Sequence, residues 1–160
     1  MELPEIILAG LALIVGIALA WRSGPMARLA LFVSALVISA MLFLPGEQLT
    51  GIIGKDATRA LKAAVADTPW DLSDWVHFVI FAWLGFLLWL GRPDLRGWTS
   101  WGLVVVLAIS AEVAQGLAPG RSPRLDDVML NLAGGMTGLL LAMGGVALTR
   151  LFRHDGKMEP

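Results

Sequence analysis

The chain has 160 residues, of which 57% are hydrophobic and only 16% are charged, and its mean hydropathy is +0.74. Soluble domains carry about 25% charged residues, so this composition excludes the soluble globular class. Twelve basic and thirteen acidic residues give a net charge of −1, which argues against a nucleic-acid partner. The absence of cysteine excludes disulfides, Cys-ligated zinc and a thiol nucleophile. The composition indicates an integral membrane protein, and we interpret residues 1–160 as one domain.

Five apolar segments are long enough to cross the membrane, since a helix needs about 20 residues to span roughly 30 Å of hydrocarbon. The sequence therefore predicts an all-α bundle of about five transmembrane helices, over residues 4–21, 29–45, 74–91, 99–117 and 127–152. The first segment also resembles a signal peptide, because Ala18-Leu19-Ala20 is similar to a cleavage site. Its leading residues include Glu2 and Glu5 but no basic residue, so we expect a retained helix.

The basic residues of the connections predict the orientation of the bundle. With five spans, one side of the membrane carries seven of them: Arg22, Arg28, Arg92, Arg96, Arg150, Arg153 and Lys157. The other side carries five: Lys55, Arg59, Lys62, Arg121 and Arg124. Because basic residues favour the cytoplasmic side, this bias predicts an external N-terminus and a cytoplasmic C-terminus.

One connection, residues 46–73, is long. Within it Lys55, Arg59 and Lys62 recur at helical spacing, and small apolar residues lie on the opposite side. This pattern is typical of a short amphipathic helix on the outer membrane surface. A solvated helical linker explains it equally well.

Polar residues within the apolar segments are costly and therefore informative. Glu112 and Gln115 share one face near the end of the fourth segment, and Asp127 and Asn131 share one face at the start of the fifth. His77 lies at the start of the third segment. Antiparallel neighbours bring these three helix ends to the same membrane side. Six polar residues should meet there: His77, Glu112, Gln115, Arg121, Asp127 and Asn131.

Each polar residue also has a purely structural explanation. Asp126 and Asp127 are placed to cap a helix, and the arginines between the last two segments can extend to the membrane surface. Asn131 can hydrogen-bond across a helix interface, where Gly134 and Gly138 permit close packing. A buried carboxylate needs a partner, so Glu112 indicates either a functional group or an ion pair that holds the bundle together.

The spacing of these residues resembles the signature of VanZ-like membrane proteins. The resemblance covers about residues 71–143 and comprises His77-Phe78, Glu112-x-x-Gln115, Pro119-Gly120-Arg121-Ser122 and Asp127-x-x-x-Asn131-x-x-Gly134-x-x-x-Gly138. It implies a small multi-pass protein of the bacterial inner membrane with a role in the cell envelope. The family takes its name from an accessory protein associated with teicoplanin resistance, and the resemblance supplies no reaction.

The chain departs from that signature at one point. Family members usually carry an Asp-Lys pair ahead of the histidine, with the aspartate four residues before it. Here Ser73 occupies that position and Asp74-Trp75 follow, so the lysine is absent. Asp74 can supply the carboxylate from the next position, but no residue replaces the lysine, so the resemblance does not assign the function of that pair to this chain.

Three functions fit these residues, and we favour the first. In a binding protein, the six polar residues hold a membrane lipid or a lipid-linked glycan headgroup, with an accessory role in glycopeptide (teicoplanin) resistance. In an intramembrane hydrolase or transferase, His77, Glu112 and Asp127 are the catalytic candidates, although the sequence specifies no nucleophile. In a structural bundle, the same groups stabilise a surface for a membrane partner or a second copy. We expect no cofactor and no metal site, since one histidine in the cluster makes zinc a poor candidate.

Overall fold

The computed structural model describes residues 3–43, 46–117 and 123–155. Over these ranges the chain is helical apart from short connections, and it contains no strand. The elements are α1 (Leu3–Trp21), α2 (Pro25–Phe43), α3 (Gly46–Ile53), α4 (Lys55–Val65), α5 (Leu72–Gly91), the 3-10 turn η1 (Pro93–Leu95), α6 (Trp98–Gly116) and α7 (Leu125–Asp155).

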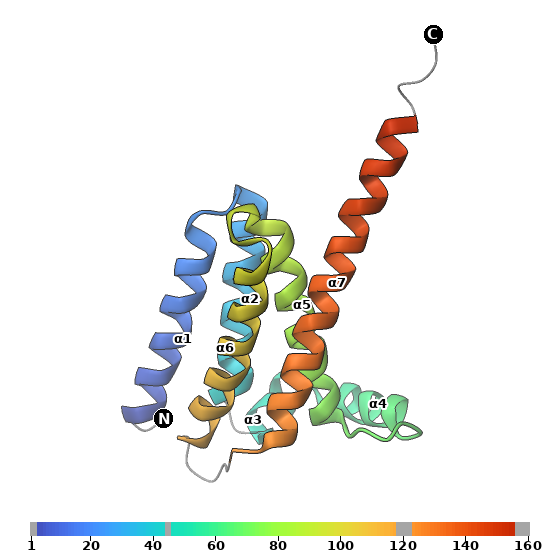
Figure 1. Cartoon of the computed structure of the whole chain (residues 1–160). Helices are drawn as coiled ribbons and strands as arrows, with labels where there is room; N and C mark the ends of the chain where they lie inside the picture. The colour runs from blue at the N-terminus through green and yellow to red at the C-terminus, as the bar shows by residue number, and fades with distance from the viewer. Residues whose placement is uncertain (1–2, 44–45, 118–122, 156–160) are drawn as a thin grey trace.

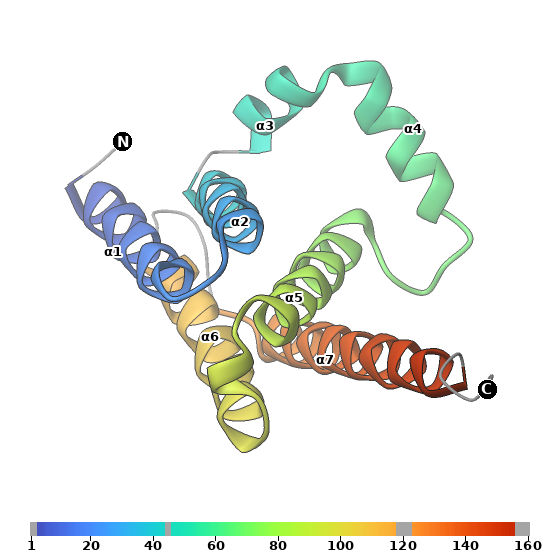
Figure 2. The ribbon, with the colours of Figure 1, turned by 90° about the horizontal axis from the view of Figure 1, so that it is seen from above.

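Four long helices run side by side, and a fifth packs at an angle against two of them, α5 and α6. Figure 1 shows α1, α2, α5 and α6 as an up-and-down bundle, with α7 packed obliquely and extending beyond the upper end. The most extensive helix contact is between α5 and α7, followed by that between α1 and α2. The short helices α3 and α4 lie across the lower end and project sideways (Figure 2). The starts of α5 and α7 and the end of α6 are therefore all at the lower end.

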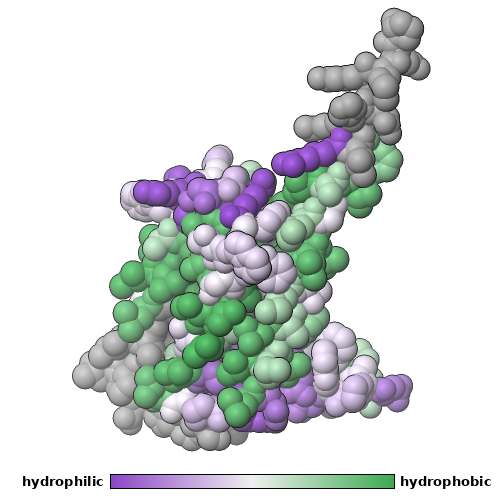
Figure 3. All heavy atoms as spheres, in the orientation of Figure 1, coloured by the Kyte–Doolittle hydropathy of each residue, from purple (hydrophilic) through white to green (hydrophobic). Residues whose placement is uncertain are grey.

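The surface has the polarity of a membrane protein. In Figure 3 a hydrophobic belt separates a polar upper end from a polar lower end. Three helices of the described chain are long and apolar enough to cross a membrane: Leu72–Gly91, Trp98–Gly116 and Leu125–Arg150. The expected all-α membrane protein is confirmed, but three spans are supported where five were predicted. The first two predicted segments do form α1 and α2. The described apolar stretch of α2, Pro25–Val37, is shorter than a membrane span, and many side chains of α1 lie outside the described residues.

Helix boundaries differ from the predicted ones for local reasons. α5 begins at Leu72 rather than Asp74, because Asp71 is its N-cap. The Asp71 carboxylate accepts the backbone N–H of Asp74 at 3.0 Å, and the Asp74 carboxylate accepts the N–H of Asp71 at 3.1 Å. This reciprocal capping box pairs N–H groups that the first helical turn would leave without acceptors. Similarly, α2 begins at Pro25, a residue suited to the first position of a helix.

Glycines bring α5 and α7 into backbone contact. A Cβ atom on Gly134 would overlap the carbonyl oxygen of Phe78, and one on Gly138 would overlap the carbonyl oxygen of Ala82. Without side chains at these positions the two helices pack backbone against backbone, as small residues allow in membrane bundles. Gly85 makes the reciprocal approach from α5, against the backbone of α7. The close approach places the polar side chains of α5 and α7 within reach of one another.

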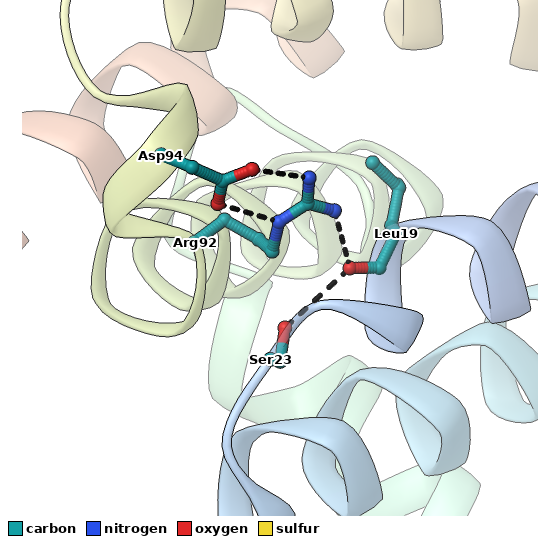
Figure 4. Close-up of polar contacts among 4 residues, drawn as sticks. All are labelled: Leu19, Ser23, Arg92 and Asp94. Carbon is teal, nitrogen blue, oxygen red and sulfur yellow. Dashed lines mark hydrogen bonds and ion pairs between the residues drawn. The ribbon is translucent and has the colours of Figure 1, made fainter.

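A buried arginine joins the helices at the upper end (Figure 4). Arg92 is only 6% exposed, and its Nε and Nη2 donate to the two carboxylate oxygens of Asp94 at 2.8 and 2.7 Å. Its Nη1 donates to the carbonyl oxygen of Leu19 at the end of α1, at 2.7 Å. The hydrogen bonds from Arg92 hold the pKa of Asp94 below its ordinary value. Arg92 thereby ties the end of α5 to the α1–α2 turn.

Candidate functional site

Five polar residues of the lower end are the core of the candidate site, and we refer to them as the end cluster. Glu112 and Gln115 come from the last turns of α6, and Asp127 and Asn131 from the first turns of α7; all four are buried. His77, near the start of α5, is half-buried. The sixth predicted residue, Arg121, lies outside the described residues. The end cluster thus draws on three helices, and each helix supplies it where it reaches the polar lower end.

His77 and Asn131 form a direct hydrogen bond across the α5–α7 interface. His77 Nδ1 lies 3.0 Å from Asn131 Oδ1. With the amide in this orientation its oxygen can only accept, so Nδ1 carries the hydrogen and Nε2 is an acceptor when the ring is neutral. The contact of Gly134 with the backbone of Phe78, next to His77, brings the two side chains to this distance. The opposite atom of the amide, Asn131 Nδ2, is buried with no hydrogen-bond partner among the described protein atoms.

Among the described residues, Glu112 is bonded to a backbone N–H and to no cation. Its Oε1 accepts the backbone N–H of Arg124 at 2.5 Å, just before α7 begins. The partial positive charge of a helix N-terminus favours a carboxylate at this place. The other oxygen, Oε2, is buried and has no partner in the part of the chain that the structure describes. Of the two ion pairs that the sequence offers for Glu112, the pair with His77 does not form, since His77 contacts Asn131 instead, and the pair with Arg121 lies outside the described residues.

The two neighbouring aspartates at the start of α7 have different environments. The side chain of Asp126 is 83% exposed and lies 3.8 Å from the Arg124 guanidinium, an ion pair that solvent screens. Asp127 is only 9% exposed and faces the interior of the bundle end. The helical rotation between consecutive residues therefore assigns one carboxylate to solvent and the other to the end cluster.

The α6–α7 junction is tightly packed around this site. A Cβ atom on Gly116 would overlap the ring of Pro123, so the last turn of α6 lies directly against the residues that precede α7. Asn131 is seven residues after Arg124, which is about 10 Å along the axis of α7. The two atoms without a partner among the described residues, on Glu112 and Asn131, therefore both lie toward the lower end of the bundle.

The end cluster offers both donors and acceptors. Within the described part of the chain, Glu112 Oε2 is a buried acceptor without a partner and Asn131 Nδ2 is a buried donor without one. Each buried polar atom left unpaired costs about 1–3 kcal/mol, so a ligand that completes these bonds gains that energy. A hydroxyl group both donates and accepts and so fits such a mixed set. Among the described residues no group of three His, Asp or Glu side chains could hold a metal ion.

Sequence reasoning missed two features of this site. The partner of Glu112 is a backbone amide, which leaves no signal in the identity of Arg124. The pairing of His77 with Asn131 depends on the rotation of α5 against α7, although the small residues at 134 and 138 pointed to a close interface there.

Comparison with known proteins gives one match. The family model described as VanZ/LLP1 matches residues 6–150, which is nearly the whole chain and extends well beyond the segment that carried the resemblance in the sequence. No curated protein and no solved structure matches. Since the family model covers far more than half of the sequence, the chain belongs to the VanZ/LLP1 family.

Proposed function

We propose that this protein binds the headgroup of a lipid or lipid-linked glycan in the bacterial cell envelope through the end cluster. The observation that carries the proposal is a pair of buried polar atoms, Glu112 Oε2 and Asn131 Nδ2, for which the described residues supply no hydrogen-bond partner. A bundle that needed polar residues only for stability would pair these atoms, because leaving them unpaired is costly. These atoms lie toward the ends of α5, α6 and α7, the three helices that are long and apolar enough to cross a membrane. The ends of membrane-spanning helices lie near the lipid headgroups.

The proposed orientation places the end cluster on the outer side of the inner membrane. It rests on the excess of basic residues in the connections of the other end, which favours the cytoplasm. In this proposal α1 and α2 also cross the membrane, which brings the number of spans to five. The N-terminus is outside and the C-terminus is cytoplasmic. Arg121 is proposed to contact a phosphate of the ligand, since a guanidinium binds phosphate bidentately. The accessory role in teicoplanin resistance would follow from binding an envelope precursor at this surface.

One observation supports a second candidate, an intramembrane hydrolase or transferase. The bond from His77 Nδ1 to Asn131 leaves Nε2 unprotonated in the neutral ring, as a general base requires. However, in the described part of the chain no carboxylate contacts His77 and no nucleophile lies in hydrogen-bond contact with it. We therefore favour binding over catalysis.

The test is native mass spectrometry of the full chain with its co-purified lipids. Glu112→Gln replaces the acceptor Oε2 by an N–H donor, and Asn131→Asp replaces the donor Nδ2 by an acceptor oxygen. Both variants keep the shape of the side chain. Each should weaken lipid retention about tenfold to a hundredfold, the equivalent of a hydrogen bond to a charged group. Asp126→Asn is the matched control, because it changes an exposed carboxylate beside the cluster and should leave retention unchanged.

Three outcomes decide between the functions. Wild-type protein that retains no lipid, or equal retention in all three variants, contradicts the binding proposal. A His77→Ala protein that still retains lipid but no longer affects teicoplanin sensitivity in cells would favour the enzyme. Loss of both retention and effect in Glu112→Gln and Asn131→Asp, with thermal stability maintained, supports binding.

A further inference from the structure

The helix α4 (Lys55–Val65) is attached to the bundle but not packed into it. None of its residues is buried. Figures 1 and 2 show it at the lower end, lying across the direction of the long helices and projecting away from them. A helix in this position lies parallel to the membrane plane if α5, α6 and α7 cross the membrane. Its exposed residues must then face water, lipid or both.

The two sides of α4 differ in chemistry. Lys55, Arg59 and Lys62 recur at three- and four-residue intervals and so share one face. Ala57, Leu61, Ala64 and Val65 lie on the opposite face, where the Leu61 side chain is 47% exposed. The preceding helix α3 adds two exposed isoleucines, Ile52 and Ile53. A basic face opposite a modest apolar face is typical of helices that lie on anionic membranes.

Aromatic residues hold the segment that follows α4 against the start of α5. The indole Nε1 of Trp75 donates to the hydroxyl of Thr68 at 3.0 Å, which ties the segment after α4 to the first turn of α5. Trp70 packs against Trp75 and Phe78, with ring centroids 5.0 and 5.5 Å apart. Tryptophan concentrates at the membrane–water interface, so this cluster marks the level of the lipid headgroups. The connection therefore holds α4 near that level.

We propose that α4 is an in-plane interfacial helix that binds anionic phospholipid at the same membrane surface as the end cluster. Its apolar face, made of two alanines, one leucine and one valine, is too small for strong insertion on its own, so attraction between its basic face and anionic headgroups supplies the rest. The helix carries three basic residues against one acidic residue, Asp56, which is itself paired with Arg59 at 3.4 Å. This interaction goes beyond the proposed function and does not depend on it.

Spin labels on the full chain test the immersion of α4. The chain has no cysteine, so single cysteines at Ala57, Leu61 and Ala64 can be labelled specifically, with Ala63 as the control near the polar edge. In nanodiscs of phosphatidylcholine and phosphatidylglycerol, the first three labels should be accessible to oxygen and protected from a water-soluble nickel chelate. The Ala63 label should show the opposite preference. Equal access of the chelate to all four labels would make α4 a solvated linker and overturn the proposal.

Charge variants test the anionic lipid. The variant Lys55→Gln, Arg59→Gln, Lys62→Gln should shift the equilibrium between immersed and solvated α4 toward water, by about fivefold for each charge removed. The charge-preserving variant Lys55→Arg, Arg59→Lys, Lys62→Arg should keep the wild-type pattern. Nanodiscs of phosphatidylcholine alone should reproduce the neutralised result with wild-type protein. Immersion that is unchanged by neutralisation or by lipid charge would contradict the proposal. Because the readout is local to α4, it stays informative even if the end cluster binds no ligand.

Discussion

Gly138→Ala tests the backbone contact between α5 and α7. A Cβ atom added at Gly138 would overlap the carbonyl oxygen of Ala82 and lie 2.7 Å from its carbonyl carbon and 2.8 Å from the backbone nitrogen of Phe86. The carbon distance is 0.7 Å short of the 3.4 Å at which ordinary contact begins. Because the obstructing atoms are backbone, no side chain can rotate away and the helices must separate.

The expected cost follows from two opposing effects. Overpacking costs about 1–3 kcal/mol, and the rigid backbone contact places this case near the upper value. Replacing a helical glycine by alanine returns about 1 kcal/mol of helix propensity. The free energy of unfolding should therefore fall by about 2 kcal/mol. Separation of α5 from α7 should also lengthen the 3.0 Å bond between His77 and Asn131 and so reduce lipid retention.

The assay is unfolding of the purified protein in mixed micelles by titration with a denaturing detergent. Gly144→Ala is the matched control, since it lies on the same helix and a Cβ there meets no atom within 4 Å. It should be neutral or stabilising by up to about 1 kcal/mol. A Gly138→Ala protein as stable as Gly144→Ala would refute the close helix contact.

Three further outcomes are expected. Glu112→Ala should lower the free energy of unfolding by about 1–3 kcal/mol, because a backbone N–H before α7 loses its acceptor; an unchanged thermal midpoint would contradict this. Hydrogen bonds from Arg92 lower the pKa of Asp94 in the folded protein. The Asp94 carboxylate therefore stabilises the fold above its unfolded pKa of about 3.9, and this stabilisation is lost as the pH falls through the lower folded pKa. Thermal midpoints of wild type should accordingly drop more steeply below about pH 4 than those of Asp94→Asn, and parallel curves would exclude the effect. In intact cells, an impermeant maleimide should label a cysteine at Asp126 but not one at Arg22; the reverse pattern would invert the proposed orientation.

The long apolar segments were predictable because the hydrocarbon thickness sets their length. The predicted segments 74–91, 99–117 and 127–152 correspond to α5, α6 and α7; the end of α5 coincides and the other boundaries differ by one to three residues. Those differences come from local caps such as the one made by Asp71, which hydropathy does not detect. The position of the end-cluster residues at one end of the bundle was also predictable. Successive membrane-spanning helices alternate in direction, so the start of α5, the end of α6 and the start of α7 must lie on the same side.

The partners of buried polar groups were not predictable, because they depend on helix rotation and on the backbone. Asp126 and Asp127 are chemically identical neighbours, yet only the packing of α7 decides which is buried. Arg92 was assigned to the basic residues of a membrane surface, whereas the turn η1 folds Asp94 back onto it and buries it. The local sequence Arg-Pro-Asp was the one available signal for that turn.

The central claim is that a ligand completes the polar contacts of Glu112 and Asn131, and a high-resolution structure of the full chain in lipid nanodiscs tests it most directly. We expect non-protein density from a lipid headgroup at about 2.5–3.2 Å from Glu112 Oε2 and Asn131 Nδ2. Density continuous with an acyl chain would identify the ligand as a lipid. Side chains of the protein bonded to both atoms, or isolated water molecules alone at both, would contradict the claim.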